Sequence, residues 1–416
     1  GQIRAEADIH PDDWFLTCHF VDDRVMPGTL MYECCAHTLR VYIQRIGWVT
    51  DKAGVCHEPV IGVESALKCR GPVTPDTRHV IYEVDIKKIG YAPEPYVIAD
   101  AQMYADGHLI VTFKDMSMKV SGITRGEIES FWEKQRSTDT IHHLKRNKSP
   151  ATVQRRPADQ KSKIENRKSK IKKPLFDREQ LFAFATGNPS EAFGAKYKPF
   201  DKDRFIARLP APPYSFIDRV VSSEPEPLLL KPGGWIVAEY KIQQSAWFFE
   251  ANRSPYLPFC ILLEIVLQPC GWLAAYLGSA FQSQHDLRFR NLGGDAILHQ
   301  NVASDAKTLT TRVKMTRVST AADMIIEHFS FQMMQSDQPI YEGNTYFGFF
   351  SEETLTKQIG IRNTEPLNYE PTSVELKEGR RHVFVDTRPL TPADARSHPS
   401  NSTKPGLTMP SKALRM

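Results

Sequence analysis

The chain contains two copies of one sequence pattern, and this internal repeat limits its fold more than any other feature does. The first copy reads PDDWFLTCHFVDDRVMPGTLMYECCAHTLRVYI and the second reads QSAWFFEANRSPYLPFCILLEIVLQPCGWLAAYL. Trp14 aligns with Trp247 at an offset of 233, whereas Pro27 aligns with Pro258 at an offset of 231, so the second copy is two residues shorter between these points. A repeat of this kind predicts two structural units of similar design.

Each copy contains a segment that is apolar on nearly all sides, at residues 29–46 and 261–277. A helix of this kind must be enclosed by other elements. A strand pattern follows each segment and ends at Val120 in the first copy and at Phe350 in the second. The predicted order is therefore a lead strand, one apolar helix and a meander of antiparallel strands. We expect an α+β fold in which each sheet wraps around its helix and the two sheets pair edge to edge, because pairing protects an exposed edge of each.

Alternating apolar and polar residues predict half-buried antiparallel strands in the first copy. These strands are expected at residues 78–86, 96–104 and 108–120, with a hairpin turn at residues 105–107.

A short helix is predicted at residues 124–135, because Thr124 can cap its N-terminus and Glu127 follows three residues later.

Charge is distributed unevenly along the chain. The formal net charge is +4, but residues 142–173 hold 12 basic and 2 acidic residues, and this local +10 leaves −6 for the remainder. Proteins that bind nucleic acid place such charge on a folded surface. Here it lies within residues 137–173, which are almost without apolar side chains, so we predict a flexible linker and no nucleic-acid partner. Docking of an acidic carrier protein on this segment is a second interpretation.

The seven cysteines are odd in number and include no Cys-x-x-Cys pair. They predict neither a zinc site nor a disulfide framework, and they favour a reduced, cytoplasmic setting. The most apolar stretch, residues 260–280, is interrupted by Glu264, Gln268 and Pro269, which favours a buried helix with a functional face over a membrane span. We expect no metal and no organic cofactor.

A family resemblance begins with WFLTCHF at residues 14–20, VMPG at residues 25–28, and Glu33. Together they resemble the active-site stretch of the 3-hydroxyacyl-acyl-carrier-protein dehydratases, which are hotdog-fold enzymes of fatty-acid synthesis. The second copy and its approach segments, RLPAPPYSFIDRV and LKPGGWIVAEY, resemble this family more distantly. Two copies on one chain, together with LFAFATGNPSEAFG, look most like the dehydratase region of polyunsaturated-fatty-acid or polyketide-type synthases.

The resemblance implies two hotdog folds paired as an intrachain pseudo-dimer. It implies dehydration of a (3R)-3-hydroxyacyl thioester on acyl carrier protein to the trans-2-enoyl thioester. Acyl carrier protein and other synthase domains would be the partners, with a homodimer as one option. A hotdog thioesterase and a non-catalytic acyl-binding or structural module of a synthase are the rival functions. A histidine with Pro-Gly before an acidic helix residue favours the dehydratase over the thioesterase, and activity itself separates the dehydratase from the module.

Four domains are predicted along the chain. They are a first hotdog (1–122), a short helix with a basic linker (123–173), a second hotdog with a lead-in segment (174–361), and a polar tail with the beginning of a further unit (362–416). Because 13 residues precede Trp14, we expect the first hotdog to lack its first strand or helix.

Dehydration needs a base near the α carbon, an acid near the β-hydroxyl and donors for the thioester oxygen, where negative charge develops. Histidine suits the base because its pKa lies near neutral pH. A carboxyl group suits the acid if an apolar site raises its pKa. A glycine at a helix N-terminus lets its N–H approach the oxygen closely.

In the resembled family the histidine of one hotdog meets the acidic residue of the other, so two sites are implied here. The first would use His19 as base and Glu264 as acid. Gly28 would donate to the thioester oxygen, and Gln268, four residues after Glu264 on the same helix face, would orient the carboxyl group. A buried core histidine is the alternative interpretation of His19.

The second implied site would pair Asn252 with Glu33, and it is degenerate. Asn252 cannot act as a base, and Phe259 stands where the first site has its glycine. Glu33 is kept as an alternative acid. For His37, a partly exposed helix histidine and a functional residue are equally compatible with the sequence.

Overall fold

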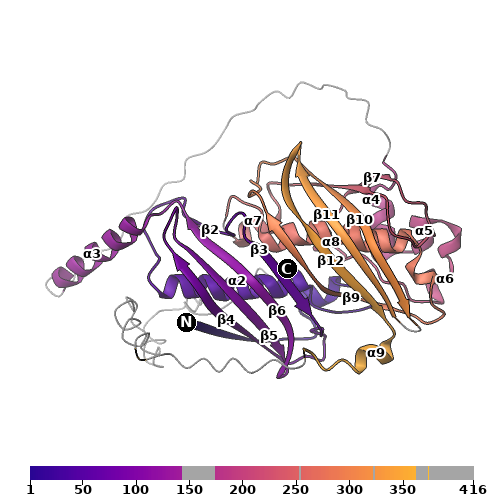
Figure 1. The fold of residues 1–416 in the computed structure, drawn as a ribbon, viewed down its shortest axis with the longest axis horizontal. Helices are drawn as coiled ribbons and strands as arrows, with labels where there is room; N and C mark the ends of the chain where they lie inside the picture. Colours follow the sequence, from indigo (N-terminus) through magenta and orange to yellow (C-terminus); the bar gives the residue numbers. More distant parts are fainter. Residues whose placement is uncertain (143–173, 253, 322–323, 362–372, 374–416) are drawn as a thin grey trace.

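The computed structural model describes residues 1–142, 174–252, 254–321, 324–361 and 373 (Figure 1). Residues 143–173 of the predicted linker at 137–173 and almost all of the predicted tail at 362–416 lie outside the described residues. The strands of the first repeat are β1 (Gln2–Asp8), β2 (Cys56–Glu58), β3 (Glu64–Cys69), β4 (His79–Gly90), β5 (Tyr96–Ala105) and β6 (His108–Ser121). Those of the second are β7 (Arg219–Ser223), β8 (Ile236–Lys241), β9 (Arg288–Leu298), β10 (Thr308–Ala321), β11 (Met324–Gln335) and β12 (Gln338–Phe350).

Helices occupy three parts of the chain. The first repeat holds α1 (Trp14–Cys18), α2 (Gly28–Arg45) and α3 (Arg125–His142). A lead-in segment holds α4 (Arg178–Thr186), α5 (Pro189–Phe193), the 3-10 turn η1 (Ala195–Tyr197) and α6 (Pro199–Lys202). The second repeat holds α7 (Trp247–Asn252), α8 (Phe259–Tyr276), the 3-10 turn η2 (Ser279–Phe281) and α9 (Glu352–Thr356).

All described strands join one antiparallel 12-stranded sheet in the order β1-β4-β5-β6-β3-β9-β12-β11-β10-β8-β7, with β2 paired to β6. The sheet passes from one repeat to the other where β3 pairs with β9, with Leu67 opposite Gly294. Figure 1 shows α2 behind the strands of the first repeat and α8 behind those of the second. The expected α+β fold of two hotdogs paired edge to edge within one chain is therefore confirmed.

The two long helices are the cores of their units, as their composition predicts. In α2 the buried side chains include Leu30, Cys35 and Leu39, so the neighbouring Cys34 and Cys35 are packing residues. Helix α8 is long and apolar enough to cross a membrane by composition alone, but 72% of it is buried inside the protein. It is the central helix of the second hotdog, and its apolar surface is covered by the sheet and the lead-in helices.

Local predictions in the first repeat are largely confirmed. Asp106 and Gly107 form the hairpin turn with φ values of 46° and 82°, the left-handed conformation that a tight hairpin requires at both central residues. The Thr124 hydroxyl accepts from the Glu127 N–H at 3.3 Å, and the Glu127 carboxylate accepts from the Thr124 N–H at 2.8 Å, which completes a capping box. The helix that follows, α3, reaches His142 and is therefore longer than the predicted helix at residues 124–135.

One expectation about the start of the first unit is corrected. The residues directly before His19 do not belong to the predicted lead strand, because Trp14–Cys18 forms the short helix α1. The lead strand is present as β1, which pairs with β4 just as β8 pairs with β10 in the second unit. The elements without a described counterpart in the first unit are β7 and the lead-in helices. The domain limits themselves stay a prediction.

Candidate active site

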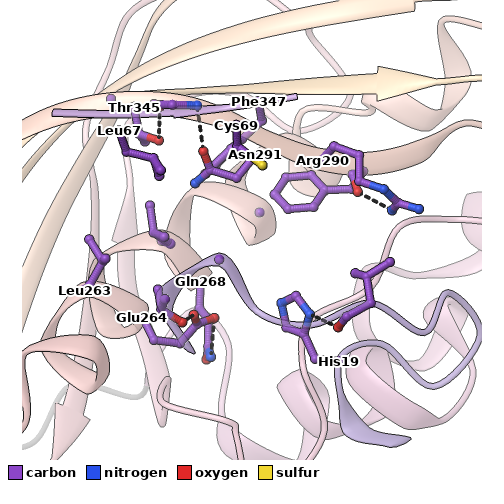
Figure 2. Close-up of a pocket in the computed structure, with 18 of the residues that line it drawn as sticks. His19, Leu67, Cys69, Leu263, Glu264, Gln268, Arg290, Asn291, Thr345 and Phe347 are labelled. Atoms are coloured by element: carbon purple, nitrogen blue, oxygen red, sulfur yellow. Dashed lines mark hydrogen bonds between the residues drawn. The ribbon is translucent and has the colours of Figure 1, made fainter. Parts of the chain in front are cut away.

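A cavity of about 150 Å³ lies where the two repeats meet. Figure 2 shows its two sides, with residues of β3, β9 and β12 on one and Glu264, Gln268 and His19 on the other. We call the strand side the roof and the opposite side the floor. Of the residues singled out from the sequence, the lining includes His19, Gly28, Glu264, Gln268 and Phe259. Glu33 and Asn252 do not line it.

His19 follows α1 and is 9% exposed. Its Nδ1 lies 2.9 Å from the carbonyl oxygen of Val25, so Nδ1 carries the hydrogen and donates. Nε2 is then the basic nitrogen of the neutral ring. Burial lowers the pKa of His19 to about 4, so the imidazole is neutral at physiological pH and can accept a proton.

Glu264 lies on α8 and is 5% exposed. The Thr29 hydroxyl donates to its Oε2 at 2.7 Å, and the Gln268 amide donates to its Oε1 at 3.2 Å. Burial raises the pKa of Glu264 to about 7, although these two hydrogen bonds oppose the rise. A carboxyl group with this pKa keeps its proton in a large fraction of molecules near neutral pH, which suits a general acid.

Gln268 is held by the approach segment of the second repeat. Its Nε2 also donates to the carbonyl oxygen of Tyr214 at 2.8 Å, and its Oε1 accepts from the Phe216 N–H at 2.7 Å. The side chain therefore has one fixed orientation, with the amide directed at Glu264. Both backbone groups belong to the PYSF stretch of the approach segment, so that stretch serves the site as well as the fold.

Two residues of this network were missed in the sequence. Thr29 donates to Glu264, and the Tyr214 hydroxyl lies 2.7 Å from the Thr29 hydroxyl, so Tyr214 donates to Thr29. Thr29 directly follows Gly28, and this position beside the glycine was the available signal. The Tyr214 contact spans 185 residues, and no local pattern carries it.

Gly28 is the first residue of α2 and follows Pro27. A Cβ built at Gly28 would have no atom within 4 Å, so the space beside its backbone is open cavity. No described group accepts a hydrogen bond from its N–H. A ligand oxygen can therefore approach this N–H at the positive end of the helix dipole.

An ion pair links the loop that carries His19 to the second repeat. Arg290 of β9 donates through Nη2 to Asp23 Oδ1 at 3.0 Å and through Nη1 to Asp23 Oδ2 at 2.5 Å. Asp23 is 8% exposed and the Arg290 side chain is 12% exposed. The Asp23 backbone in turn bonds with Phe20 in both directions, so the pair holds the turn that follows His19.

In the second predicted site, Glu33 and Asn252 are already paired with neighbouring side chains. Glu33 pairs with His37 at 2.9 Å. Burial alone would raise the pKa of Glu33, but the hydrogen bond and charge of His37 and the charge of Arg40 lower it below its usual value. The Arg40 guanidinium donates to Asn252 Oδ1 at 3.3 Å. A carboxylate in this state is a poor proton donor, and Asn252 is already bound.

Phe259 is the first residue of α8, the position equivalent to Gly28 in α2. Its side chain occupies the space that, beside Gly28, is open. Its ring centroid lies 5.0 Å from that of Tyr32 and 5.5 Å from that of Tyr341. The ring forms part of the cavity wall rather than a second anion site.

Among the described residues, no group of three or more His, Cys, Asp and Glu side chains is placed to hold a metal ion.

A family model and a curated relative match most of the chain. The model of the FabA-like domain family matches residues 1–114 and 209–344. One subunit of the polyunsaturated fatty acid synthase of Thraustochytrium sp. is 25% identical over 483 aligned positions, which cover 94% of this chain and 32% of that protein. The chain thus spans about a third of the length of this relative.

Two solved structures illustrate the structural neighbours. One is a putative oleoyl thioesterase from Lactobacillus plantarum, at 11% identity and a TM-score of 0.43 over 85% of this chain and 98% of that one. The other is the dehydratase domain from the CurJ module of the curacin polyketide synthase, at 11% identity and a TM-score of 0.42 over 85% of this chain and 94% of that one. The family match includes His19 and Glu264, one in each matched segment.

Proposed function

The chain belongs to the FabA-like domain family, and on that premise we propose that it dehydrates a (3R)-3-hydroxyacyl thioester to the trans-2-enoyl thioester. The observation that carries the proposal is the pairing of His19 and Glu264 in one cavity. The pKa of one is lowered to about 4 and that of the other is raised to about 7. Between these values a neutral base and a protonated acid coexist, which is the combination that elimination of water requires.

The proposed reaction begins at His19. Its Nε2 takes a proton from the α carbon, and the electron pair moves onto the thioester oxygen, which accepts from the Gly28 N–H. Glu264 gives its proton to the β-hydroxyl, the C–O bond breaks, and water leaves as the double bond forms. His19 then loses its proton and Glu264 regains one, so the protein is unchanged and the substrate has lost one water.

Thr29 and Gln268 have positioning roles in this proposal. Both donate to Glu264, so they orient the carboxyl group and stabilise the carboxylate that remains after proton transfer. Because both are themselves held by the approach segment, the acid does not have to reorganise during the reaction.

The substrate is proposed to arrive on acyl carrier protein, with other synthase domains as further partners and the cytoplasm as the setting. The name of the fatty acid synthase relative supports this context. Apolar residues dominate the cavity wall, including Leu263, Leu267, Phe289 and Phe347, and such a wall suits an acyl chain.

A direct test follows the fate of a 3-hydroxyacyl N-acetylcysteamine thioester. The dehydratase forms the enoyl thioester without releasing thiol, whereas a thioesterase releases thiol and a non-catalytic module does neither. The His19→Ala variant should lose about 100- to 10,000-fold of the rate, the usual contribution of a general base. Thiol release by the wild type, or an unchanged rate in His19→Ala, would refute the proposal.

A further inference from the structure

Asn291 lies on the cavity roof, on the side opposite His19 and Glu264 (Figure 2). Its neighbours on the roof are mostly apolar and include Leu67, Cys69 and Phe347. A carboxamide among such residues is costly unless its polar atoms find partners. Neither the sequence pattern nor the proposed mechanism accounts for this residue.

A β-bulge sets the direction of Asn291. Strand β12 pairs through Tyr346 with Gly293 and through Phe347 with Asn291, so Leu292 is the extra residue in β9. A bulge of this kind redirects the side chain beside it.

Close packing fixes the bulge in place. The Thr345 hydroxyl donates to the Gly293 carbonyl oxygen at 3.0 Å. A Cβ at Gly293 would lie 2.3 Å from the Leu67 carbonyl oxygen, and its φ of 146° also favours glycine. The backbone beside Asn291 therefore has little freedom.

One hydrogen bond orients the Asn291 amide. Its Oδ1 accepts from the Gly293 N–H at 2.8 Å, which leaves the Nδ2 donor without a partner among the described residues. Asn291 is half-buried and lines the cavity, and its Nδ2 keeps some accessible surface, so this donor can be reached from the cavity. The structure thus holds a preorganised donor above the acid–base pair.

We infer that Asn291 Nδ2 donates the second hydrogen bond to the thioester oxygen, from the roof, while the Gly28 N–H donates from the floor. The inference rests on the proposed function. When His19 removes the α proton, negative charge develops on this oxygen, and one donor from each side stabilises it. No proton is transferred to or from Asn291.

The kinetic test replaces Asn291 with Asp and with Leu, both close to Asn in size. Asp keeps an oxygen for the Gly293 N–H but loses the donor, and Leu loses both. Each variant should lower kcat by about 100- to 1,000-fold, as removal of one oxyanion donor does, with KM nearly unchanged. Asn188→Asp, the same change on the exposed cap of α5, should keep wild-type kcat. Circular dichroism and the Tm of each variant check that it folds.

A second measurement reports on the bond itself. A trans-2-enoyl N-acetylcysteamine thioester with a ¹³C carbonyl is bound to His19→Ala, which prevents turnover, and its carbonyl stretch is recorded by difference infrared spectroscopy. The stretch should lie below its value in water and move back towards that value in His19→Ala/Asn291→Asp.

The outcomes separate the two ideas. An unchanged stretch, or a folded Asn291→Asp variant with normal kcat, would overturn the role of Asn291. A higher KM with normal kcat would also overturn it, because the side chain would then bind another part of the thioester. If the stretch responds to Asn291 but the wild type makes no enoyl product, the proposed function fails and the hydrogen bond stands.

Discussion

At the scale of single residues, burial is what separates the chemistry of His19 from that of Glu264. Both side chains are removed from water, and the same desolvation lowers the pKa of the base and raises the pKa of the acid. Hydrogen bonds add to this effect. The Val25 carbonyl oxygen fixes the tautomer of His19, and the Thr29 hydroxyl limits the rise in the pKa of Glu264.

The pH dependence of kcat/KM should therefore be a plateau with two limbs. Activity requires protonated Glu264, so kcat/KM should fall about tenfold per pH unit above about 7. It also requires neutral His19, so kcat/KM should decline as the pH drops below about 4. The profile is measured by enoyl formation at low substrate concentration.

Thr29→Val supplies the matched variant for this profile. The Thr29 hydrogen bond holds the pKa of Glu264 down, so its removal should move the alkaline limb to higher pH while the acid limb stays in place. An alkaline limb that is absent up to pH 9 in the wild type, or unmoved in Thr29→Val, would argue against Glu264 as the acid.

At the scale of elements, the sequence predicts the long elements well and the short ones poorly. The apolar helices α2 and α8 and the alternating strands β4 to β6 are long enough for their periodicity to be read. Four of the five residues of α1 are apolar, and five residues are too few for a period of 2 or 3.6 to be recognised, so the sequence does not distinguish a strand from a helix there.

The residues of the candidate site likewise fall into those that the sequence indicates and those that only the fold reveals. His19, Gly28, Glu264 and Gln268 were accessible through the resemblance, and they line one cavity. Tyr214 and the Asp23–Arg290 ion pair are contacts across 185 and 267 residues, which only the folded chain brings together.

The Asp23–Arg290 pair should position the loop of His19. Arg290→Met leaves Asp23 buried with only the more distant Arg288 at 3.5 Å. Loss of one partner of a buried pair costs about 3–5 kcal/mol, so both Tm and kcat should fall. Thermal unfolding and steady-state kinetics measure the two effects.

Asp22→Ala is the control for that variant, because Asp22 also pairs across the repeats, with Arg208 at 2.8 Å, but is 36% exposed. The Arg208 side chain is 11% exposed, but without Asp22 it keeps the carbonyl oxygens of Phe184 and Gly187 as partners. The loss should therefore be small, as it is for partly exposed pairs. Equal losses in the two variants would show that Arg290 has no special role near His19.

At the scale of the whole molecule, one continuous sheet makes the candidate active site a joint product of both repeats. Strand β9 pairs with β3 of the first repeat and with β12 of the second, and the same strands roof the cavity. The degenerate second site follows from the same arrangement, because Phe259 fills the place of the glycine and becomes part of the cavity wall.

The two repeats join where β3 pairs with β9, and the backbone is packed closely at this junction. The stability of the protein should therefore be sensitive to one added methyl group there. A Cβ at Gly294 would lie 2.3 Å from the Asn344 carbonyl oxygen, so Gly294→Ala must shift the backbone of β9. Overpacking of this kind costs about 1–3 kcal/mol, and we expect a lower Tm together with reduced activity.

Gly126→Ala in α3 is the matched change, because a Cβ there meets nothing within 4 Å and alanine favours helices. Its Tm should equal or exceed that of the wild type. If Gly294→Ala leaves both Tm and activity unchanged, the junction does not control the roof of the cavity.

The central claim is that one acid–base pair works across the two repeats, and comparison of two glutamate variants tests it most directly. The measurement is the rate of enoyl thioester formation by Glu264→Gln and by Glu33→Gln. Loss of the proton donor in Glu264→Gln should lower the rate by about 100- to 10,000-fold, and a working pair across the repeats predicts this loss. The same pair predicts a rate near the wild type for Glu33→Gln, because Glu33 is paired with His37 and lies outside the cavity. An active Glu264→Gln beside an inactive Glu33→Gln would contradict the claim.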